Sequence, residues 1–167
     1  DNAFTPLQLA TDCATIANNG TRLKTHLVKQ VTNYNRDQVI SETEPEVVAQ
    51  VDISEENLKT VQEAMKGVTQ SGGTANSVFG DYGITIAAKT GTAENPGHSD
   101  NVTFIAYAPY DDPEIAVAVV LEYGSRGTYS MNVAKDMFDA YFYGKTVDEN
   151  GNLVMPEETN SSSTANE

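Results

Sequence analysis

The chain has 167 residues, about the length of one domain, and 39% of them are hydrophobic, which is enough to build a core. Ten Lys and Arg stand against 24 Asp and Glu, a formal net charge of −14. This charge argues against a nucleic acid or an anionic membrane surface as partner, because like charges repel. The longest apolar run, residues 115–121, is far below the roughly 20 residues that cross a bilayer.

The first predicted element is a helix over residues 6–19. Thr5 and Gln8 have the spacing of a capping box, a proline occupies the first helical position, and Gly20 stands where a left-handed glycine would end the helix. Apolar residues cover more than half of its circumference, which predicts packing on more than one side. Cys13, the only cysteine, excludes an internal disulfide and is expected to be a small buried side chain.

Residues 21–53 alternate between short β-branched runs and polar stretches, a pattern that predicts short strands and loops. Ser54 is the expected N-cap of a second helix, and Gly72-Gly73 should stop it. Three strand-like runs follow, over residues 84–90, 103–108 and 114–123. Strands in succession between helices predict an α+β fold, an antiparallel sheet flanked by helices.

A last helix is expected over about residues 129–143. Its spacing places a set of apolar residues on one side: Val133, Met137, Ala140 and Tyr141. From Gly144 the chain turns polar and acidic, and residues 144–167 are expected to form a disordered tail. The predicted folded part is therefore residues 1–143.

Lys89 is the only Lys or Arg between Lys66 and Arg126, and it stands at the end of an apolar strand. It is followed at once by Thr90, Gly91 and Thr92. An ammonium attracts a carboxylate, a hydroxyl orients it, and a glycine lets a ligand backbone come close. This pattern predicts a carboxylate site at a sheet edge; the alternative is a strand-end lysine that reaches solvent before a turn.

Two other kinds of site are not favoured. Gly83 to Thr90 falls one residue short of a phosphate-binding loop, but Ala88 replaces its second glycine and the intervening residues have a strand pattern. His26 and His98 lack a metal-like spacing and are interpreted as structural or surface residues, although His98 could line a cleft after the strand. No metal, nucleotide or other cofactor is therefore predicted.

The segment Lys89-Thr90-Gly91-Thr92-Ala93-Glu94 resembles the KTG box of penicillin-binding protein transpeptidases and serine β-lactamases. Three further stretches resemble the class B penicillin-binding proteins, in the right order. They are Thr5 to Ala10 leading to Ile16–Gly20, then Phe104 to Pro109, then Ile115 to Val120 running into Glu122. The resemblance spans residues 5 to about 143.

The resemblance implies a role for each matched position. Lys89 would add positive potential near the nucleophile, and Thr90 would hydrogen-bond the carboxylate of a stem peptide or a β-lactam. Gly91 would keep the strand edge open, and the backbone N–H of Thr92 would be one of two oxyanion-hole donors. Substrate would lie along the edge as an added strand.

The chain departs from the family pattern in its nucleophile. No Ser is followed three residues later by Lys, so there is no S-x-x-K motif, and no S-x-N triplet precedes Lys89. Ser130-Met131-Asn132 fits that triplet but follows the box, and it is interpreted as an N-cap coincidence. We therefore expect the C-terminal part of a transpeptidase domain, inactive alone and dependent on the missing N-terminal part of its own domain.

The implied parent protein is a D,D-transpeptidase that acts on peptidoglycan stem peptides, binds β-lactams, and sits at the extracytoplasmic face of the bacterial membrane. Because the chain begins with Asp1 rather than Met, preceding residues and any anchor are expected outside it. A non-catalytic binding or sensor module, and a related D,D-carboxypeptidase or β-lactamase, remain alternatives. In the family that the chain resembles, the sheet takes its outer strands from earlier sequence. The resemblance therefore implies a sheet with a missing neighbour here, either left open or paired with another chain.

Overall fold

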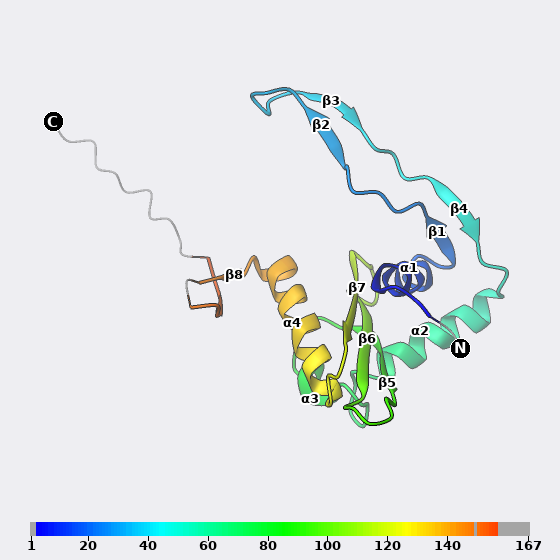
Figure 1. Cartoon of the computed structure of the whole chain (residues 1–167). Helices are drawn as coiled ribbons and strands as arrows, with labels where there is room; N and C mark the ends of the chain where they lie inside the picture. The colour runs from blue at the N-terminus through cyan, green and yellow to red at the C-terminus, as the bar shows by residue number, and fades with distance from the viewer. Residues whose placement is uncertain (1–2, 149, 157–167) are drawn as a thin grey trace.

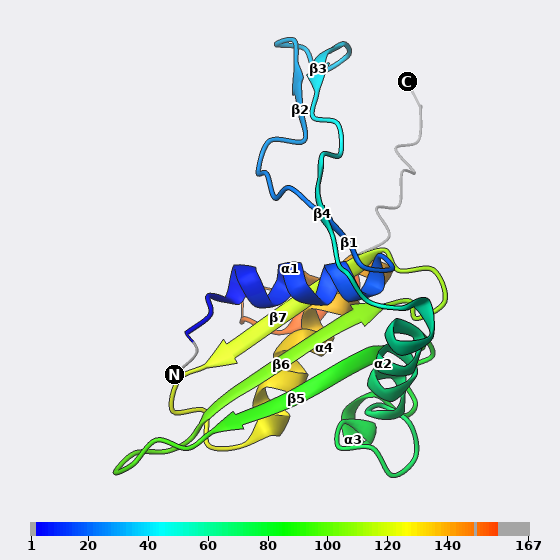
Figure 2. The same ribbon diagram turned by 90° about the vertical axis from the view of Figure 1, so that its right-hand side faces the viewer.

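The computed structural model describes residues 3–148 and 150–156. Its centre is an antiparallel sheet of three strands in the order β5-β6-β7, with helices on both faces (Figures 1 and 2). The predicted α+β class, an antiparallel sheet flanked by helices, is confirmed. The strands are β5 (Ala87–Ala93), β6 (Asn101–Ala108) and β7 (Ile115–Leu121).

Helix α1 (Pro6–Ala17) begins as its capping box predicts. The Gln8 amide donates to the Thr5 hydroxyl at 3.2 Å, and the Thr5 amide donates to the Gln8 side-chain oxygen at 2.8 Å. At the other end the left-handed residue is Asn19 (φ 51°), with Gly20 (φ 81°) following it. The helix is therefore two residues shorter than predicted and ends in an Asn–Gly pair rather than at a single glycine.

Helix α1 contacts β6 and β7 of the sheet and also α2 (Glu55–Gly67) and β1 (Thr21–Leu23), so the prediction of packing on more than one side is confirmed. Cys13 and Ala17 are buried against the sheet, whereas Leu7 is 62% exposed. The outer face of α1 lines an open groove of about 690 Å³ together with β1 and residues 111–116. Burial, with a smaller contribution from Asp12, raises the pKa of Cys13 to about 12, so the thiol is inert as expected of a buried cysteine.

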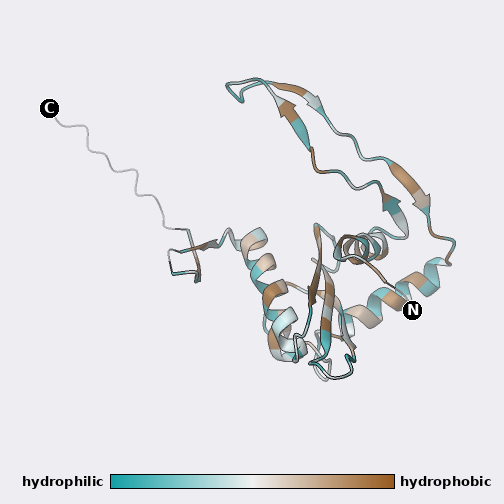
Figure 3. Cartoon of the chain, viewed as in Figure 1, coloured by the Kyte–Doolittle hydropathy of each residue, from teal (hydrophilic) through white to brown (hydrophobic). Residues whose placement is uncertain are grey.

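Residues 21–53 form a two-stranded arm that projects away from the sheet (Figures 1 and 2). The predicted short strands are present, β1 pairing with β4 and β2 with β3, both antiparallel. Much of its apolar surface is exposed, as the brown segments of Figure 3 show for both limbs. The strands are β1 (Thr21–Leu23), β2 (Gln30–Thr32), β3 (Val39–Glu42) and β4 (Val47–Gln50).

Helix α2 (Glu55–Gly67) starts at the predicted N-cap, where the Ser54 hydroxyl accepts from the Asn57 amide at 3.3 Å. It ends at Gly67, earlier than the predicted stop at Gly72-Gly73. A tight turn and the short helix α3 (Asn76–Phe79), which was not predicted, lead from there toward β5. Figure 2 shows α2 and α3 next to the start of β5.

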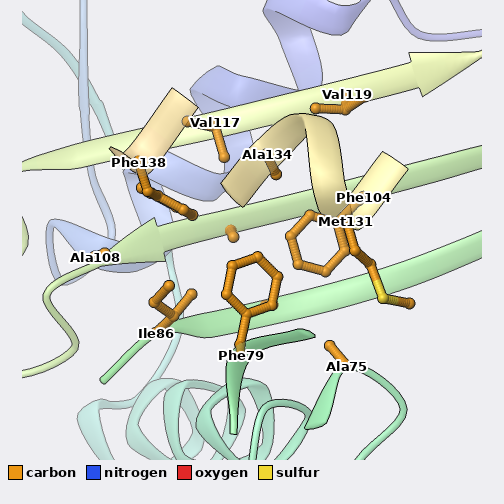
Figure 4. Close-up of a cluster of buried hydrophobic side chains, with 12 residues drawn as sticks. Ala75, Phe79, Ile86, Phe104, Ala108, Val117, Val119, Met131, Ala134 and Phe138 are labelled. Atoms are coloured by element: carbon orange, nitrogen blue, oxygen red, sulfur yellow. The ribbon is translucent and has the colours of Figure 1, made fainter. Parts of the chain in front are cut away.

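The two faces of the sheet bury different side chains. One face packs Phe104 against Phe79 of α3 and Phe138 of α4 (Gly127–Tyr143), and Phe79 and Phe104 stack with ring centroids 5.5 Å apart (Figure 4). The other face packs Ala87 and Tyr107 against α1 and α2. The strands are thus apolar on both faces at the start of β5, as sheets covered on both sides are.

Helix α4 (Gly127–Tyr143) buries a different side from the predicted one. Val133, Met137 and Tyr141 are exposed, whereas Met131, Ala134 and Phe138 are buried. The helix is apolar around most of its surface, so the 3.6-residue period alone did not identify the packed face. Its N-cap is Arg126, and the buried Ser130 hydroxyl donates to the Gly127 carbonyl within the first turn, so Ser130 is not an N-cap.

Asp139 of α4 anchors the end of the helix. Its carboxylate, 3% exposed, accepts from Tyr82 Oη at 2.8 Å, Lys135 Nζ at 2.9 Å and Lys145 Nζ at 2.8 Å.

The tail expected to be disordered begins at Gly144, directly after α4. Part of it is ordered, because β8 (Thr146–Val147) pairs with β9 (Leu153–Val154). The remainder of the expected tail, residues 157–167, lies outside the described residues, as does residue 149.

We predict that Asp139→Asn destabilises the fold at neutral pH by about 2 kcal/mol, because it removes charge-assisted hydrogen bonds from a buried group. Burial alone would raise the pKa of Asp139, but the hydrogen bonds from Lys145, Lys135 and Tyr82 outweigh it and lower the pKa. A lowered pKa in the folded state means that the stabilisation is complete above the unfolded value of about 4 and is lost as the pH falls below it.

Urea unfolding at pH 7 and at pH 2.5 checks this prediction. The difference between wild type and Asp139→Asn should be large at pH 7 and small at pH 2.5. Asp136→Asn, an exposed carboxylate on the same helix, is the matched control and should leave stability unchanged at both pH values. Equal stability of Asp139→Asn and wild type at pH 7 would contradict the anchoring role.

Candidate active site

The four residues singled out in the sequence, Lys89 to Thr92, all lie on β5, which is an edge strand. β6 pairs along one side of it, with Lys89 opposite Ile105 and Thr92 opposite Val102. Within the described residues no strand pairs along its other side. Figure 2 shows this open edge, with α2 and α3 beside the start of the strand only.

Two hydrogen bonds donated by side chains show which backbone groups face the open edge. The Ile86 carbonyl accepts from the Thr69 hydroxyl at 2.7 Å, and the Thr90 carbonyl accepts from Lys89 Nζ at 2.6 Å. In a strand, the N–H and C=O of one residue point to the same side, and that side alternates along the chain. Thr92 therefore has the same orientation as Thr90, with its N–H toward the open edge.

Side chains on β5 alternate between the two faces of the sheet. Lys89 lies on the face of Ala87, toward α1 and α2, and Thr90 lies on the face of Ala88, toward α4. The bond from Lys89 Nζ to the Thr90 carbonyl brings the ammonium around the strand to the edge. A cation, a hydroxyl and an N–H donor thus meet along one stretch of open backbone.

The ammonium of Lys89 has no carboxylate partner among the described residues. It is exposed, and the nearest acidic residue along the strand, Glu94, is exposed as well. Lys89 is therefore a local positive charge at this edge that no described carboxylate neutralises directly, in a chain whose net charge is −14. The ammonium and the hydroxyl can together bind an anion, and a carboxylate is small enough to contact both.

A hydroxyl that the sequence did not single out joins this group. Thr74 Oγ1 lies 3.2 Å from Thr90 Oγ1, close enough for a hydrogen bond in which either atom could donate. Thr74 belongs to the turn between α2 and α3 and is 16 residues away in the chain. No spacing rule connects the two, and only the Gly72-Gly73 turn signal marked the region as special.

The two histidines lie away from the edge residues. His98, in the loop between β5 and β6, packs its ring against Tyr123 with centroids 5.2 Å apart, and His26 is exposed on the arm with Nδ1 3.3 Å from the Lys24 carbonyl. Across residues 3–148 and 150–156, no group of three or more His, Cys, Asp or Glu side chains could hold a metal ion.

Neither S-x-N triplet in the chain provides a helper serine at the site. Ser130 is buried in α4. Ser99–Asp100–Asn101 is a second such triplet and also follows Lys89. Its Asn101 side chain accepts from the Tyr123 amide at 2.9 Å and supports a turn in which Tyr123 has a positive φ of 55°.

Known proteins are similar to this chain in sequence and in fold. The family described as "Penicillin binding protein transpeptidase domain" matches residues 2–142. Penicillin-binding protein 2A of Bacillus subtilis is 35% identical over 160 residues, and the peptidoglycan D,D-transpeptidase PbpA of Mycolicibacterium smegmatis is 37% identical over 131 residues. The aligned parts cover 84% and 74% of this chain but only 22% and 25% of those two proteins.

Solved structures agree. Penicillin-binding protein 2B of Streptococcus pneumoniae superposes with a TM-score of 0.71 at 32% identity, covering 83% of this chain and 24% of that one. Penicillin-binding protein A of M. tuberculosis, as its imipenem acyl-enzyme complex, also gives 0.71, at 30% identity, covering 84% and 31%. The chain therefore belongs to the penicillin-binding protein transpeptidase family, as its motifs suggested.

We predict that Gly91 and Gly73 respond in opposite ways to alanine. A Cβ on Gly91 would lie 3.5 Å from the Thr103 Cβ, an ordinary contact, so Gly91→Ala should keep or slightly raise the melting temperature. A Cβ on Gly73 would lie 2.2 Å from the Val68 carbonyl oxygen, so Gly73→Ala should destabilise the fold by roughly 2–4 kcal/mol.

Thermal unfolding of the two variants beside wild type measures both effects. A large loss of stability in Gly91→Ala would show that the sheet itself requires the glycine. The expected result would show that the fold tolerates a side chain at position 91. A side chain there would then matter only to a ligand that approaches the open edge.

Proposed function

We propose that residues 1–143 are the C-terminal part of the transpeptidase domain of a peptidoglycan D,D-transpeptidase, followed by a polar acidic tail at 144–167. The observation that carries the proposal is the open edge of β5, where the Lys89 ammonium, the Thr90 hydroxyl and the Thr92 N–H lie along unpaired backbone. The chain spans 22% of the length of penicillin-binding protein 2A and 25% of PbpA, so the activity belongs to a longer protein.

In the proposed reaction a serine oxygen attacks the penultimate D-Ala carbonyl of a stem peptide. The bond to the terminal D-Ala nitrogen breaks, and that D-Ala leaves with the serine proton on its amine. An amine of a second stem peptide then attacks the acyl-enzyme and releases the serine, which regains a proton. The products are a cross-linked peptide and free D-Ala.

This chain would supply the part of the site that holds the donor. The terminal carboxylate would bind the Lys89 ammonium and the Thr90 hydroxyl, and the donor backbone would pair with the open edge as an added strand. The Thr92 N–H would donate to the oxyanion that forms on the attacked carbonyl. Gly91 would let the peptide approach without a side chain in the way.

β-Lactam binding follows from the same chemistry, since the drug presents a carboxylate and a reactive carbonyl in the places of the donor. M. tuberculosis penicillin-binding protein A has been solved as acyl-enzyme complexes with imipenem and with penicillin G. That relative, similar over 84% of this chain, supports the proposal of β-lactam as a ligand here.

The proposed location of the parent protein is the extracytoplasmic face of the bacterial membrane, where peptidoglycan is assembled. Within the part of the chain that the structure describes, no helix combines the length and the apolar character needed to span a bilayer.

We predict that Lys89→Ala in the full-length protein slows acylation by fluorescent penicillin about 100- to 1000-fold, because the carboxylate loses the cation that this chain would supply. The second-order acylation constant, from the time course of labelling, is the measurement. Lys59→Ala, an exposed lysine on α2, is the control and should leave the constant unchanged. An unchanged constant in Lys89→Ala would mean that Lys89 is only a solvent-exposed strand residue.

We also predict that the 167-residue chain alone is not labelled, since it contains no S-x-x-K serine. The full-length protein should be labelled and should lose the label when its nucleophilic serine is replaced by alanine. Covalent labelling of the isolated chain, seen as a mass increase, would refute the assignment of this chain as the donor-binding part alone.

A further inference from the structure

We propose that Thr74 is a positioning residue for the carboxylate site: its hydroxyl orients the hydroxyl of Thr90 so that Thr90 can donate to the ligand. This inference rests on the proposed function, because it assigns a role within the same site. The observation behind it is the 3.2 Å contact between Thr74 Oγ1 and Thr90 Oγ1, made by side chains of two different elements.

The turn that carries Thr74 is held tightly on both sides. Gly73, immediately before it, has no room for a side chain, because a Cβ would lie 2.2 Å from the Val68 carbonyl oxygen. Ala75, immediately after it, is fully buried in the core beside Phe79, and its amide donates to the Val68 carbonyl at 2.9 Å. Thr74 therefore projects from a turn whose position is determined by packing.

The same turn is hydrogen-bonded to Ile86, the residue that precedes β5. Thr69, which is 1% exposed, donates its hydroxyl to the Ile86 carbonyl at 2.7 Å. The Asn76 side chain donates to the Thr69 carbonyl at 3.2 Å and braces the turn from the other end. Because Thr69 occupies the open edge at Ile86, a ligand strand can pair with β5 only beyond that point, where Thr90 and Thr92 follow.

The role of Thr74 follows from the number of protons on two hydroxyls. Each threonine hydroxyl has one proton to donate and can accept from other donors. If Thr90 donated to Thr74, it would have no proton for a carboxylate. If Thr74 donates to Thr90, the Thr90 proton is free for the ligand, and the chain of two donors strengthens that bond.

Binding of an anion selects this second arrangement. A carboxylate beside Thr90 can only accept, so Thr90 must donate to it, and Thr74 supplies the proton that Thr90 Oγ1 then accepts. Thr74 is exposed and its hydroxyl is free to rotate, so the switch needs no movement of the backbone. Loss of the Thr74 hydroxyl would leave Thr90 in place but without its orienting donor.

The test uses the full-length protein with two probes, penicillin G and its methyl ester, and compares acylation constants by mass spectrometry. Thr74→Val, which keeps the shape of the side chain, should lower the constant for penicillin G about tenfold, the effect expected from one hydroxyl hydrogen bond. Thr74→Ser should restore most of the rate, because it returns the hydroxyl. For the methyl ester, which lacks the carboxylate, Thr74→Val and wild type should differ less than twofold.

Controls separate this role from a loss of structure. Ser77→Ala removes an exposed hydroxyl from the neighbouring helix α3 and should acylate like wild type with both probes. An equal loss with penicillin G and with the ester, or no rescue by Thr74→Ser, would overturn the positioning role. If the wild-type protein is acylated normally and Thr74→Val acylates as fast, this inference fails alone; if the wild type is not acylated at all, the proposed function fails with it.

Discussion

The structure depends on one strand, β5, which is packed on both faces and, among the described residues, paired with another strand along only one edge. Ala87 and Ala88 are fully buried on opposite faces of the sheet, so β5 cannot shift without opening a core on one side or the other. β6 holds its inner edge in register over all seven residues. The outer edge is left with polar backbone that a peptide can complete, and the candidate site is built there.

Rigidity is supplied to this edge by groups that lie outside the sheet. The Thr69–Ile86 hydrogen bond joins the turn after α2 to the start of the strand, and Asp139 joins α4 to Tyr82 in the segment between α3 and β5. The first of these hydrogen bonds is buried and the second is part-buried, and shielded hydrogen bonds order their partners more strongly than exposed ones do. The carboxylate site is thus presented on a supported strand and not on a free loop.

Much of this architecture could be predicted from the sequence, because its signals are local. The capping box at Thr5, the N-cap at Ser54 and the strand patterns each involve residues a few positions apart. The KTG segment was identified by resemblance, and its position on a sheet edge agreed with its chemistry. The comparisons establish the family, while the individual roles of Lys89 to Thr92 stay proposals.

The features that the sequence did not predict depend on contacts between distant residues. The buried side of α4 is determined by the rings of Phe79 and Phe104, which lie outside the helix, and its own apolar residues are spread around the axis. Thr74 meets Thr90 only because the chain turns back after Gly67 instead of continuing the helix to Gly72. Spacing rules describe one element at a time, so they could not anticipate either pairing.

The alternation along β5 has a consequence for how this segment can change in evolution. A substitution at any one position alters one side chain and leaves its neighbours where they were. Deletion or insertion of one residue between Ile86 and Lys89 would instead exchange inner and outer edges for every residue of the strand beyond it. Thr92 would then turn its N–H toward β6, and the two faces would exchange Lys89 and Thr90. The length of this segment is therefore under a stricter constraint than the identity of most of its residues.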